Sequence, residues 1–199
     1  QGSHPVASCV VFRDGKPSRK EYRHFNIKTV EGPDDYASMR EVVFRRYTRL
    51  MAEGAELPDL IIADGGKGQM GVIHEVLERL GLDIPIAGLA KDDRHRTAEL
   101  LCGFPPLLVG IRPTSPLFHF LSQIQEEVHR FAIAFHRQKR SKAFIHSELE
   151  QIEGIGDKTV QTLLRHFRTV EKVRAANIEE LSALVGPAKA KKIKAFFEK

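Results

Sequence analysis

Short apolar runs alternate with longer amphipathic stretches over the first two thirds of the chain. Residues 6–12 are rich in β-branched side chains, and residues 21–27 alternate polar and apolar positions, so the two segments predict a β-hairpin. Residues 60–63 form an apolar run that is too short for a helix and is bounded by proline and glycine, which predicts a buried strand. Residues 84–90 predict a second buried strand.

Three other stretches place apolar residues at helical spacing. A helix is predicted to begin around Pro33, Asp34 and Asp35, and another covers residues 72–80 and ends at Gly81. A long helix is predicted to begin at Ser115, where serine can cap and proline can fill the first turn. The order ββαβαβ predicts an α/β fold with a partly parallel sheet. Residues 100–112 are apolar but irregular and predict an extended excursion.

The last third of the chain contains two short helical units, each preceded by a glycine turn. Gly154, Ile155 and Gly156 precede the first unit, and Gly186 precedes a degenerate second copy. Glycines keep such a turn free of side chains, so that backbone N–H groups at a helix start can hold a phosphate oxygen. This pattern is typical of helix-hairpin-helix DNA binding, and the alternative is an ordinary turn between helices.

Composition narrows the classes of partner and site. The chain has 199 residues, 42% of them hydrophobic, a net charge of +5 and a pI of about 9.3, which favours a polyanionic partner. Two cysteines predict no disulfide framework and fit a reducing cytoplasm. No apolar run approaches the ~20 residues that span a membrane. The chain begins at Gln1 directly before a strand, which predicts a fragment of a longer protein.

Asp64 is the first candidate for chemistry, because it ends a predicted strand and is followed by three glycines and Lys67. Open α/β sheets bind ligands at this end of their strands. A strand-end carboxylate can equally cap the next helix. The spacing fits neither a phosphate-binding P-loop nor a dinucleotide fingerprint, so nucleotide binding at this loop is a weak third hypothesis.

The long helix carries further candidates beside its apolar stripe. Glu126, His129 and His136 share an adjacent face, as a metal or acid–base site requires, although a histidine in this position is more often a hydrogen-bonded core residue. Residues 130–142 contain five Lys or Arg and no acid. A basic helix end suits both the helix dipole and phosphate contacts. Residues 141–147 are the predicted linker.

Seven segments, taken in order, closely resemble the C-terminal half of the UvrC family, the nuclease subunit of bacterial nucleotide excision repair. The resemblance covers essentially the whole chain. Its carriers are Val6–Phe12, Tyr22–Ile27, Asp34–Met39, Asp64–Gln69, Glu127–Ile133, His136–Arg140 and Gly154–Gly156.

The resemblance implies an α/β RNase H-like endonuclease domain over residues 1–140, with a mixed sheet and flanking helices. It also implies a small all-α tandem helix-hairpin-helix domain over residues 148–199. Asp64 and His129 are then catalytic and hold Mg²⁺ or Mn²⁺, and Asp35 matches a carboxylate that the family needs for incision 5′ to a lesion. Lys67 either meets the scissile phosphate or is solvated.

DNA contacts are expected from ten residues: Lys67, Arg137, Lys139, Arg140, Gly154, Ile155, Gly156, Lys158, Gly186 and Lys189. The expected partners are double-stranded DNA with a lesion, bubble or junction, and UvrB through a region upstream of this chain. The family also has a strand ending in a metal-binding aspartate upstream of Gln1. Residues 125–127 read Gln-Glu-Glu where the family usually has Arg-Asp-Glu. The alternative function is a DNA-binding module that positions a nuclease or a junction and cuts nothing.

Overall fold

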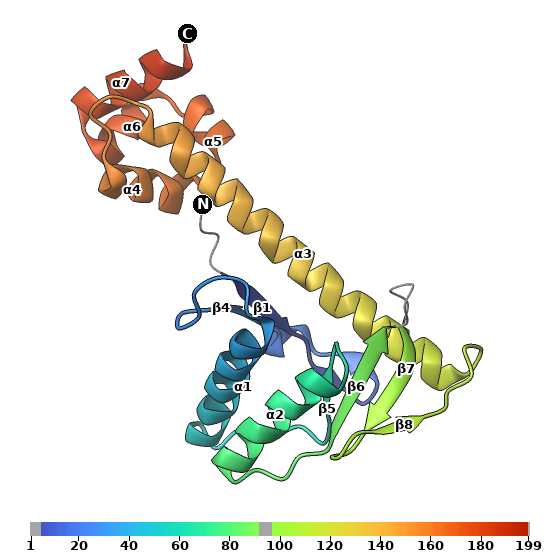
Figure 1. The fold of residues 1–199 in the computed structure, drawn as a ribbon. Helices are drawn as coiled ribbons and strands as arrows, with labels where there is room; N and C mark the ends of the chain where they lie inside the picture. Colours follow the sequence, from blue (N-terminus) through green and yellow to red (C-terminus); the bar gives the residue numbers. More distant parts are fainter. Residues whose placement is uncertain (1–4, 92–96, 199) are drawn as a thin grey trace. The chain divides into compact units, whose positions relative to one another are not determined.

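The computed structural model describes residues 5–91 and 97–198, which form two compact units, 1–133 and 134–199 (Figure 1). The first unit contains eight strands, a short 3-10 helix and two helices, and it includes the first half of a third helix, α3. The second unit contains the rest of α3 and four shorter helices. The elements are β1 (Val6–Cys9), β2 (Phe12–Arg13), β3 (Lys16–Pro17), η1 (Arg19–Glu21), β4 (Arg23–Asn26), α1 (Asp35–Ala52), β5 (Ile61–Ala63), α2 (Lys67–Leu80), β6 (Ile86–Lys91), β7 (Thr97–Cys102), β8 (Leu107–Val109), α3 (Pro116–Glu150), α4 (Asp157–Phe167), α5 (Val170–Ala175), α6 (Ile178–Val185) and α7 (Pro187–Phe197).

The predicted N-terminal hairpin is confirmed. Strand β1 pairs antiparallel with β4, and Val6 lies opposite Asn26. The predicted first strand is interrupted after Cys9, and Phe12 and Arg13 instead pair with β3 in a separate two-stranded ribbon. The turn of that ribbon uses Asp14 and Gly15, both with positive φ, as a tight hairpin requires.

The main sheet has four strands in the order β5-β6-β7-β8. Strands β5 and β6 are parallel, as the ββαβαβ order predicted, and β7 and β8 continue the sheet antiparallel. The extended excursion expected over residues 100–112 contains regular paired strands, because β7 and β8 form an antiparallel hairpin there. Leu100 and Leu101 in β7 are both buried, one on each face, so this strand lacks the polar–apolar alternation that marks a half-exposed strand.

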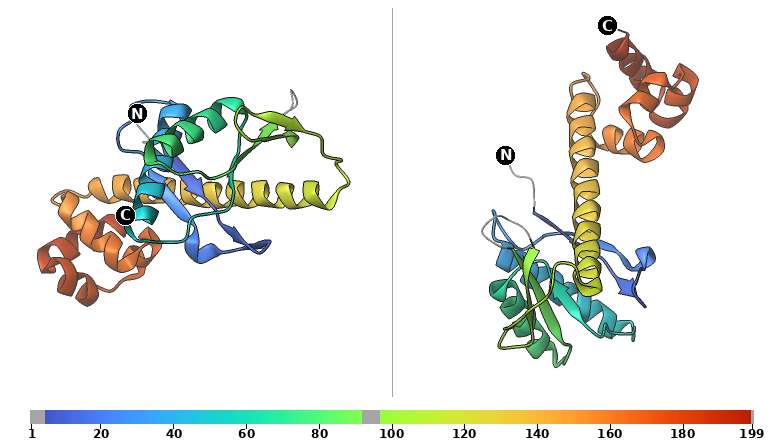
Figure 2. Two further views of the ribbon diagram at one scale, coloured as in Figure 1. Left: turned by 90° about the horizontal axis from the view of Figure 1, so that it is seen from below. Right: turned by 90° about the vertical axis from the view of Figure 1, so that its right-hand side faces the viewer.

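Helices cover both faces of this sheet. Met70 and Ile73 of α2 and Val43 of α1 pack with Ala63 and Ile86 on one face. On the other face, Leu89 and Leu100 pack with Leu121 of α3, and Ile124 lies against the same cluster. Figure 2 shows α2 and the first turns of α3 on opposite sides of the strands. Strands β5, β6 and β7 are therefore covered on both sides, whereas the three residues of the edge strand β8 are exposed.

The predicted helix starts follow their capping residues. The backbone N–H of Ala37 donates to Asp34 Oδ1 at 2.9 Å, and that of Phe118 donates to Ser115 Oγ at 3.2 Å. Gly81 ends α2 with φ 69°, the left-handed conformation that glycine adopts without strain. Helix α2 begins at Lys67, five residues before the predicted start, since its early glycines hide the helical pattern without preventing the turn.

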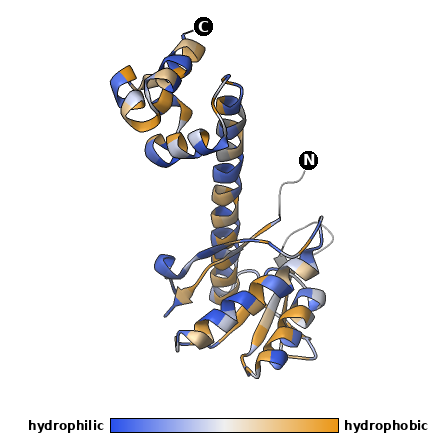
Figure 3. Cartoon of the chain, turned by 90° about the vertical axis from the view of Figure 1, so that its left-hand side faces the viewer, coloured by the Kyte–Doolittle hydropathy of each residue, from blue (hydrophilic) through white to orange (hydrophobic). Residues whose placement is uncertain are grey.

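The second unit has a hydrophobic core of its own. Twelve buried residues from Leu149 to Ile193 form it, and Val160, Leu163 and Leu181 are completely buried. Residues 141–147 are helical, where the sequence predicted a linker, because they contain neither glycine nor proline and continue α3. Figure 3 shows hydrophilic and hydrophobic residues alternating along α3, as expected for an amphipathic helix. No helix in the described part of the chain is long and apolar enough to cross a membrane.

Candidate functional site

Asp64 lies directly after β5, at the carboxyl end of a strand that is parallel to its neighbour β6. Its two carboxylate oxygens are held separately. Gln125 donates from Nε2 to Oδ1 at 2.8 Å, and His129 Nε2 lies 2.6 Å from Oδ2. Both partners come from α3, so the structure joins the strand end to the long helix at this carboxylate.

Gln125 and His129 reach Asp64 together because they lie four residues apart on one face of α3. The side chains of His129 and Asp64 are 45% and 31% exposed, so the pair is open to a ligand from solvent. The sequence placed Glu126 beside His129, but it is Gln125 that contacts Asp64. The spacing of four residues from His129 was the signal that could have identified Gln125.

The helix next to His129 is fixed by contacts from the N-terminal hairpin. The Tyr22 hydroxyl donates to Glu127 Oε1 at 2.9 Å, and the His24 ring stacks on Phe131 with centroids 3.7 Å apart. The ion pair with Arg130 and the Tyr22 hydrogen bond hold the pKa of Glu127 down to about 2, and burial raises the pKa of Tyr22 to about 12. These contacts span about a hundred residues of sequence, and no local pattern predicts them.

The backbone after Asp64 is closely packed near two glycines, Gly68 in α2 and Gly88 in β6. A side chain at Gly68 would collide with the hydroxyl and ring of Tyr36. At Gly88 in β6, a Cβ would lie 2.7 Å from the carbonyl oxygen of Gly65 and 2.6 Å from Met70 Sδ. These close approaches fix the backbone that follows Asp64.

Asp35 and Lys67 lie at the first positions of α1 and α2, and both are exposed. The side chain of Tyr36 in α1 packs against Gly68 in α2, and this contact brings the two helix starts together. Among the described residues, no hydrogen bond or ion pair joins Asp35 to Asp64. Gly66 precedes Lys67 without a side-chain cap, so the first N–H groups of α2 are free of a capping side chain, a setting that attracts anions.

The fit of the Asp64–His129 pair to a divalent cation follows from its donor atoms. A carboxylate oxygen and an imidazole nitrogen lie side by side with access to solvent. Manganese and zinc accept this mixture, whereas magnesium prefers oxygen ligands. Within the described residues the pair supplies two protein ligands, and the remaining positions are left to water or to substrate oxygens.

In the second unit, the predicted hairpin turn lies between the end of α3 and α4. Ile152 and Ile155 are buried in the core, and Gly154 has φ 82°. Gly156 caps α4, and a Cβ at this position would meet nothing within 4 Å. The fold therefore requires glycine at 154 but not at 156.

The predicted cations of the second unit differ in their surroundings. Arg137, Arg140 and Lys158 are exposed, whereas the Lys139 ammonium lies 5.8 Å from the Phe135 ring centroid. Lys189 donates from Nζ to Thr159 Oγ1 at 2.9 Å and so connects α7 with α4. Gly186, with φ 89°, ends α6 and begins α7.

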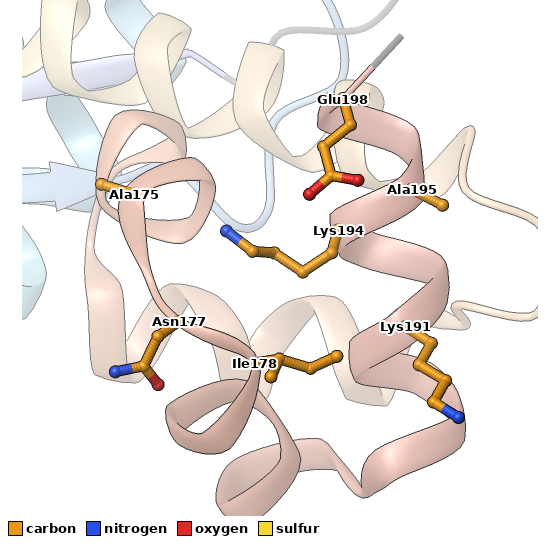
Figure 4. A pocket seen from close by; sticks show the side chains of 7 residues that line it. All are labelled: Ala175, Asn177, Ile178, Lys191, Lys194, Ala195 and Glu198. Atoms are coloured by element: carbon orange, nitrogen blue, oxygen red, sulfur yellow. The ribbon is translucent and has the colours of Figure 1, made fainter.

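A separate pocket of about 520 Å³ lies among α5, α6 and α7 (Figure 4). Its lining consists of Ala175, Asn177, Ile178, Lys191, Lys194, Ala195 and Glu198. Lys194 donates to the carbonyl oxygen of Arg174 at 3.2 Å. No residue that the sequence singled out lines this pocket.

Two family models match the chain, one over each unit. The family model described as the UvrC RNAse H endonuclease domain matches residues 1–133, and a SAM-like helix-hairpin-helix tandem matches residues 147–199. These matches confirm the predicted RNase H-like fold followed by a helix-hairpin-helix domain.

Individual relatives agree with the family models. The chain is 61% identical over 194 residues to the UvrABC system protein C of Bacteroides fragilis, and 59% identical over 195 residues to that of Bacteroides thetaiotaomicron. Each match covers 98% of this chain and 32% of the relative. The Streptococcus uberis protein of the same name is 56% identical over 190 residues, or 95% of the chain. The chain thus spans about a third of the length of these relatives.

Proposed function

Because this chain belongs to the UvrC family, we propose that it forms the catalytic half of an excinuclease subunit in nucleotide excision repair. The proposed reaction is metal-dependent hydrolysis of a DNA phosphodiester 5′ to a lesion. The observation that carries the proposal is the Asp64 carboxylate at a strand end, held by Gln125 and His129 from a helix on one face of the sheet.

Asp64 and His129 would hold the divalent cation, Mg²⁺ or Mn²⁺. When bound, the cation supplies Lewis-acid stabilisation of the charge that develops on the phosphate. Gln125 fixes one oxygen of Asp64 and leaves the other directed at His129, so the two ligand atoms keep one relative orientation. The Tyr22–Glu127 hydrogen bond, two residues from His129, restrains α3 at this point. Such restraint matters, because hydrolysis tolerates little displacement of the groups around the phosphorus.

Asp35 and Lys67 are proposed to act from the paired helix starts beside this centre. Lys67 stands in the first turn of α2, where its ammonium and the free N–H groups add positive potential for a scissile phosphate. Asp35 would contribute a second carboxylate once substrate and cation are present. Both side chains are exposed and can therefore reach a bound strand.

The second unit is proposed to hold the DNA backbone. The open space at Gly156 and the exposed Lys158 at the start of α4 leave room for a phosphate oxygen. Arg137, Lys139 and Arg140 would add contacts that depend on salt and not on sequence. The substrate would be double-stranded DNA with a lesion or bubble, delivered with UvrB bound to a region upstream of this chain.

The test is Mn²⁺-dependent nicking of supercoiled plasmid. It compares this chain and a version extended upstream, each assayed with and without Asp64→Asn. The matched control is Asp59→Asn, which makes the same chemical change at an exposed residue before the same strand. We expect nicking that is retained in Asp59→Asn and lost in Asp64→Asn, with DNA affinity unchanged. Folding of each variant is checked by circular dichroism.

Two results would overturn the proposal. If Asp64→Asn nicks as fast as Asp59→Asn, the carboxylate is not catalytic. If the extended protein is folded and binds DNA but never nicks with Mg²⁺ or Mn²⁺, the DNA-binding module becomes the better description.

A further inference from the structure

Three potential metal ligands meet around the hairpin turn of the second unit, apart from the Asp64 site. His146 and Glu150 lie in the last turns of α3, and Asp157 is the first residue of α4. His146 Nδ1 lies 3.3 Å from Glu150 Oε1, and His146 Nε2 lies 2.8 Å from Asp157 Oδ1. One ligand atom from each residue can be chosen so that all three lie within 4.8 Å of one another.

The fold brings these side chains together by two simple devices. His146 and Glu150 are four residues apart, so they project from the same face of α3. The turn then reverses the chain, because Gly154 adopts φ 82° while Ile152 and Ile155 are buried in the core. Asp157 is oriented in turn, since Gln161 Nε2 donates to its Oδ2 at 3.1 Å and leaves Oδ1 toward His146.

The charges in this cluster do not balance. Two carboxylates share one imidazole, so the three side chains carry a net charge of −1 when His146 is protonated and −2 when it is neutral. A bound divalent cation would neutralise the cluster with neutral histidine. It would also place that positive charge beside Asp157 at the start of α4, where an uncompensated carboxylate would repel anions.

The three side chains must move closer together to bind one ion. Ligand atoms bound at about 2.0–2.2 Å in a tetrahedral site lie roughly 3.4 Å apart, whereas the ligand atoms here lie within 4.8 Å of one another. The three side chains are 34%, 50% and 60% exposed for His146, Glu150 and Asp157, so they can rotate toward one another without disturbing the core.

We propose that His146, Glu150 and Asp157 form a binding site for a divalent transition-metal ion, with Zn²⁺ the best match. Imidazole nitrogen favours zinc over magnesium, and one nitrogen with two carboxylate oxygens leaves a fourth position for water. The site spans the turn between α3 and α4 and would fix that turn. It is independent of the nuclease activity proposed above, and either can fail without the other.

The experiment measures Zn²⁺ binding by isothermal titration and Co²⁺ binding by visible absorption. Both use the full chain carrying Asp64→Ala and His129→Ala, which removes the other candidate ligands. His146→Ala and Glu150→Gln are added singly to this background. The matched control is His166→Ala, since His166 is an exposed histidine of the same unit on α4.

We expect one equivalent of Zn²⁺, a Co²⁺ spectrum typical of low coordination number, and at least a tenfold loss of affinity in both ligand variants. Removing a residue that only hydrogen-bonds to a metal ligand already lowers metal affinity about tenfold or more, so removing a ligand should cost at least as much. His166→Ala should bind as the background does. Glu150→Gln keeps the size of the side chain, so it tests the site even if His146→Ala fails to fold. Absence of saturable binding in the background, or equal affinity in His146→Ala and His166→Ala, would overturn the proposal.

Discussion

Replacing Gly88 with alanine tests whether the backbone after Asp64 is as tightly enclosed as the structure indicates. The added methyl group would meet the carbonyl oxygen of Gly65 at 2.7 Å and the sulfur of Met70 at 2.6 Å. Met70 is fully buried, and a backbone carbonyl cannot rotate away as a flexible side chain does. The strand or the loop must therefore move.

The magnitude follows from two opposing effects. Overpacking of this kind costs up to about 3 kcal/mol. Alanine in a strand regains about 0.5–1 kcal/mol relative to glycine. The net loss for Gly88→Ala is then about 2 kcal/mol, and with a urea m-value of about 2 kcal/mol/M the midpoint should fall by roughly 1 M.

Tyrosine fluorescence during urea unfolding is the suitable assay. The chain has no tryptophan, and its three tyrosines, at positions 22, 36 and 47, all lie in the first unit, so the signal reports that unit alone. Gly71→Ala is the control, because its Cβ would meet nothing within 4 Å and alanine favours the interior of α2. Its midpoint should rise by a few tenths molar. An unchanged or higher midpoint for Gly88→Ala would refute the steric reasoning.

The remaining predictions concern the hairpin and one ion pair. Gly156→Ala should leave stability unchanged but weaken DNA binding roughly tenfold, since a hydrogen bond to a charged group contributes about 1.5–3 kcal/mol. Fluorescence anisotropy measures this binding, and undiminished binding at physiological salt would contradict the phosphate role. Gly154→Ala should instead lower the melting temperature, because φ 82° strains any other residue; a melting temperature equal to that of Gly156→Ala would contradict this. The pKa of Glu127 is lowered from 4.5 to about 2 in the folded protein, so its stabilising effect is present above pH 4.5 and is lost as pH falls toward 2. Urea unfolding should therefore show Glu127→Gln to be less stable than the parent protein at pH 6, with the difference shrinking toward pH 2; a difference independent of pH would show that the ion pair is not its cause.

The sequence predicted the elements whose signals are local. In the structure, Asp34 and Ser115 cap the starts of helices and Gly81 ends one, as the sequence indicated. The apolar run before Asp64 forms the expected strand. The early part of α2 was missed because its glycines hid the helical spacing of apolar residues. The β7–β8 hairpin was missed because β7 is buried on both faces and so lacks polar–apolar alternation.

The candidate site was predictable only in part. Asp64 and His129 could be singled out, and the structure brings them within 2.6 Å of each other. Gln125 was passed over in favour of Glu126, although its spacing of four residues from His129 places the two side chains on one helix face. The bond between Tyr22 and Glu127 depends on how distant segments pack, and that information is not present in any short stretch of sequence.

The separate core of the second unit has an evolutionary consequence. Its buried residues contact one another within residues 149–193 and include no member of the sheet clusters. Substitutions in one core therefore leave the packing of the other largely unchanged, so the second unit can accumulate changes while the contacts around Asp64 stay the same. Such a unit is suited to being inherited as a module.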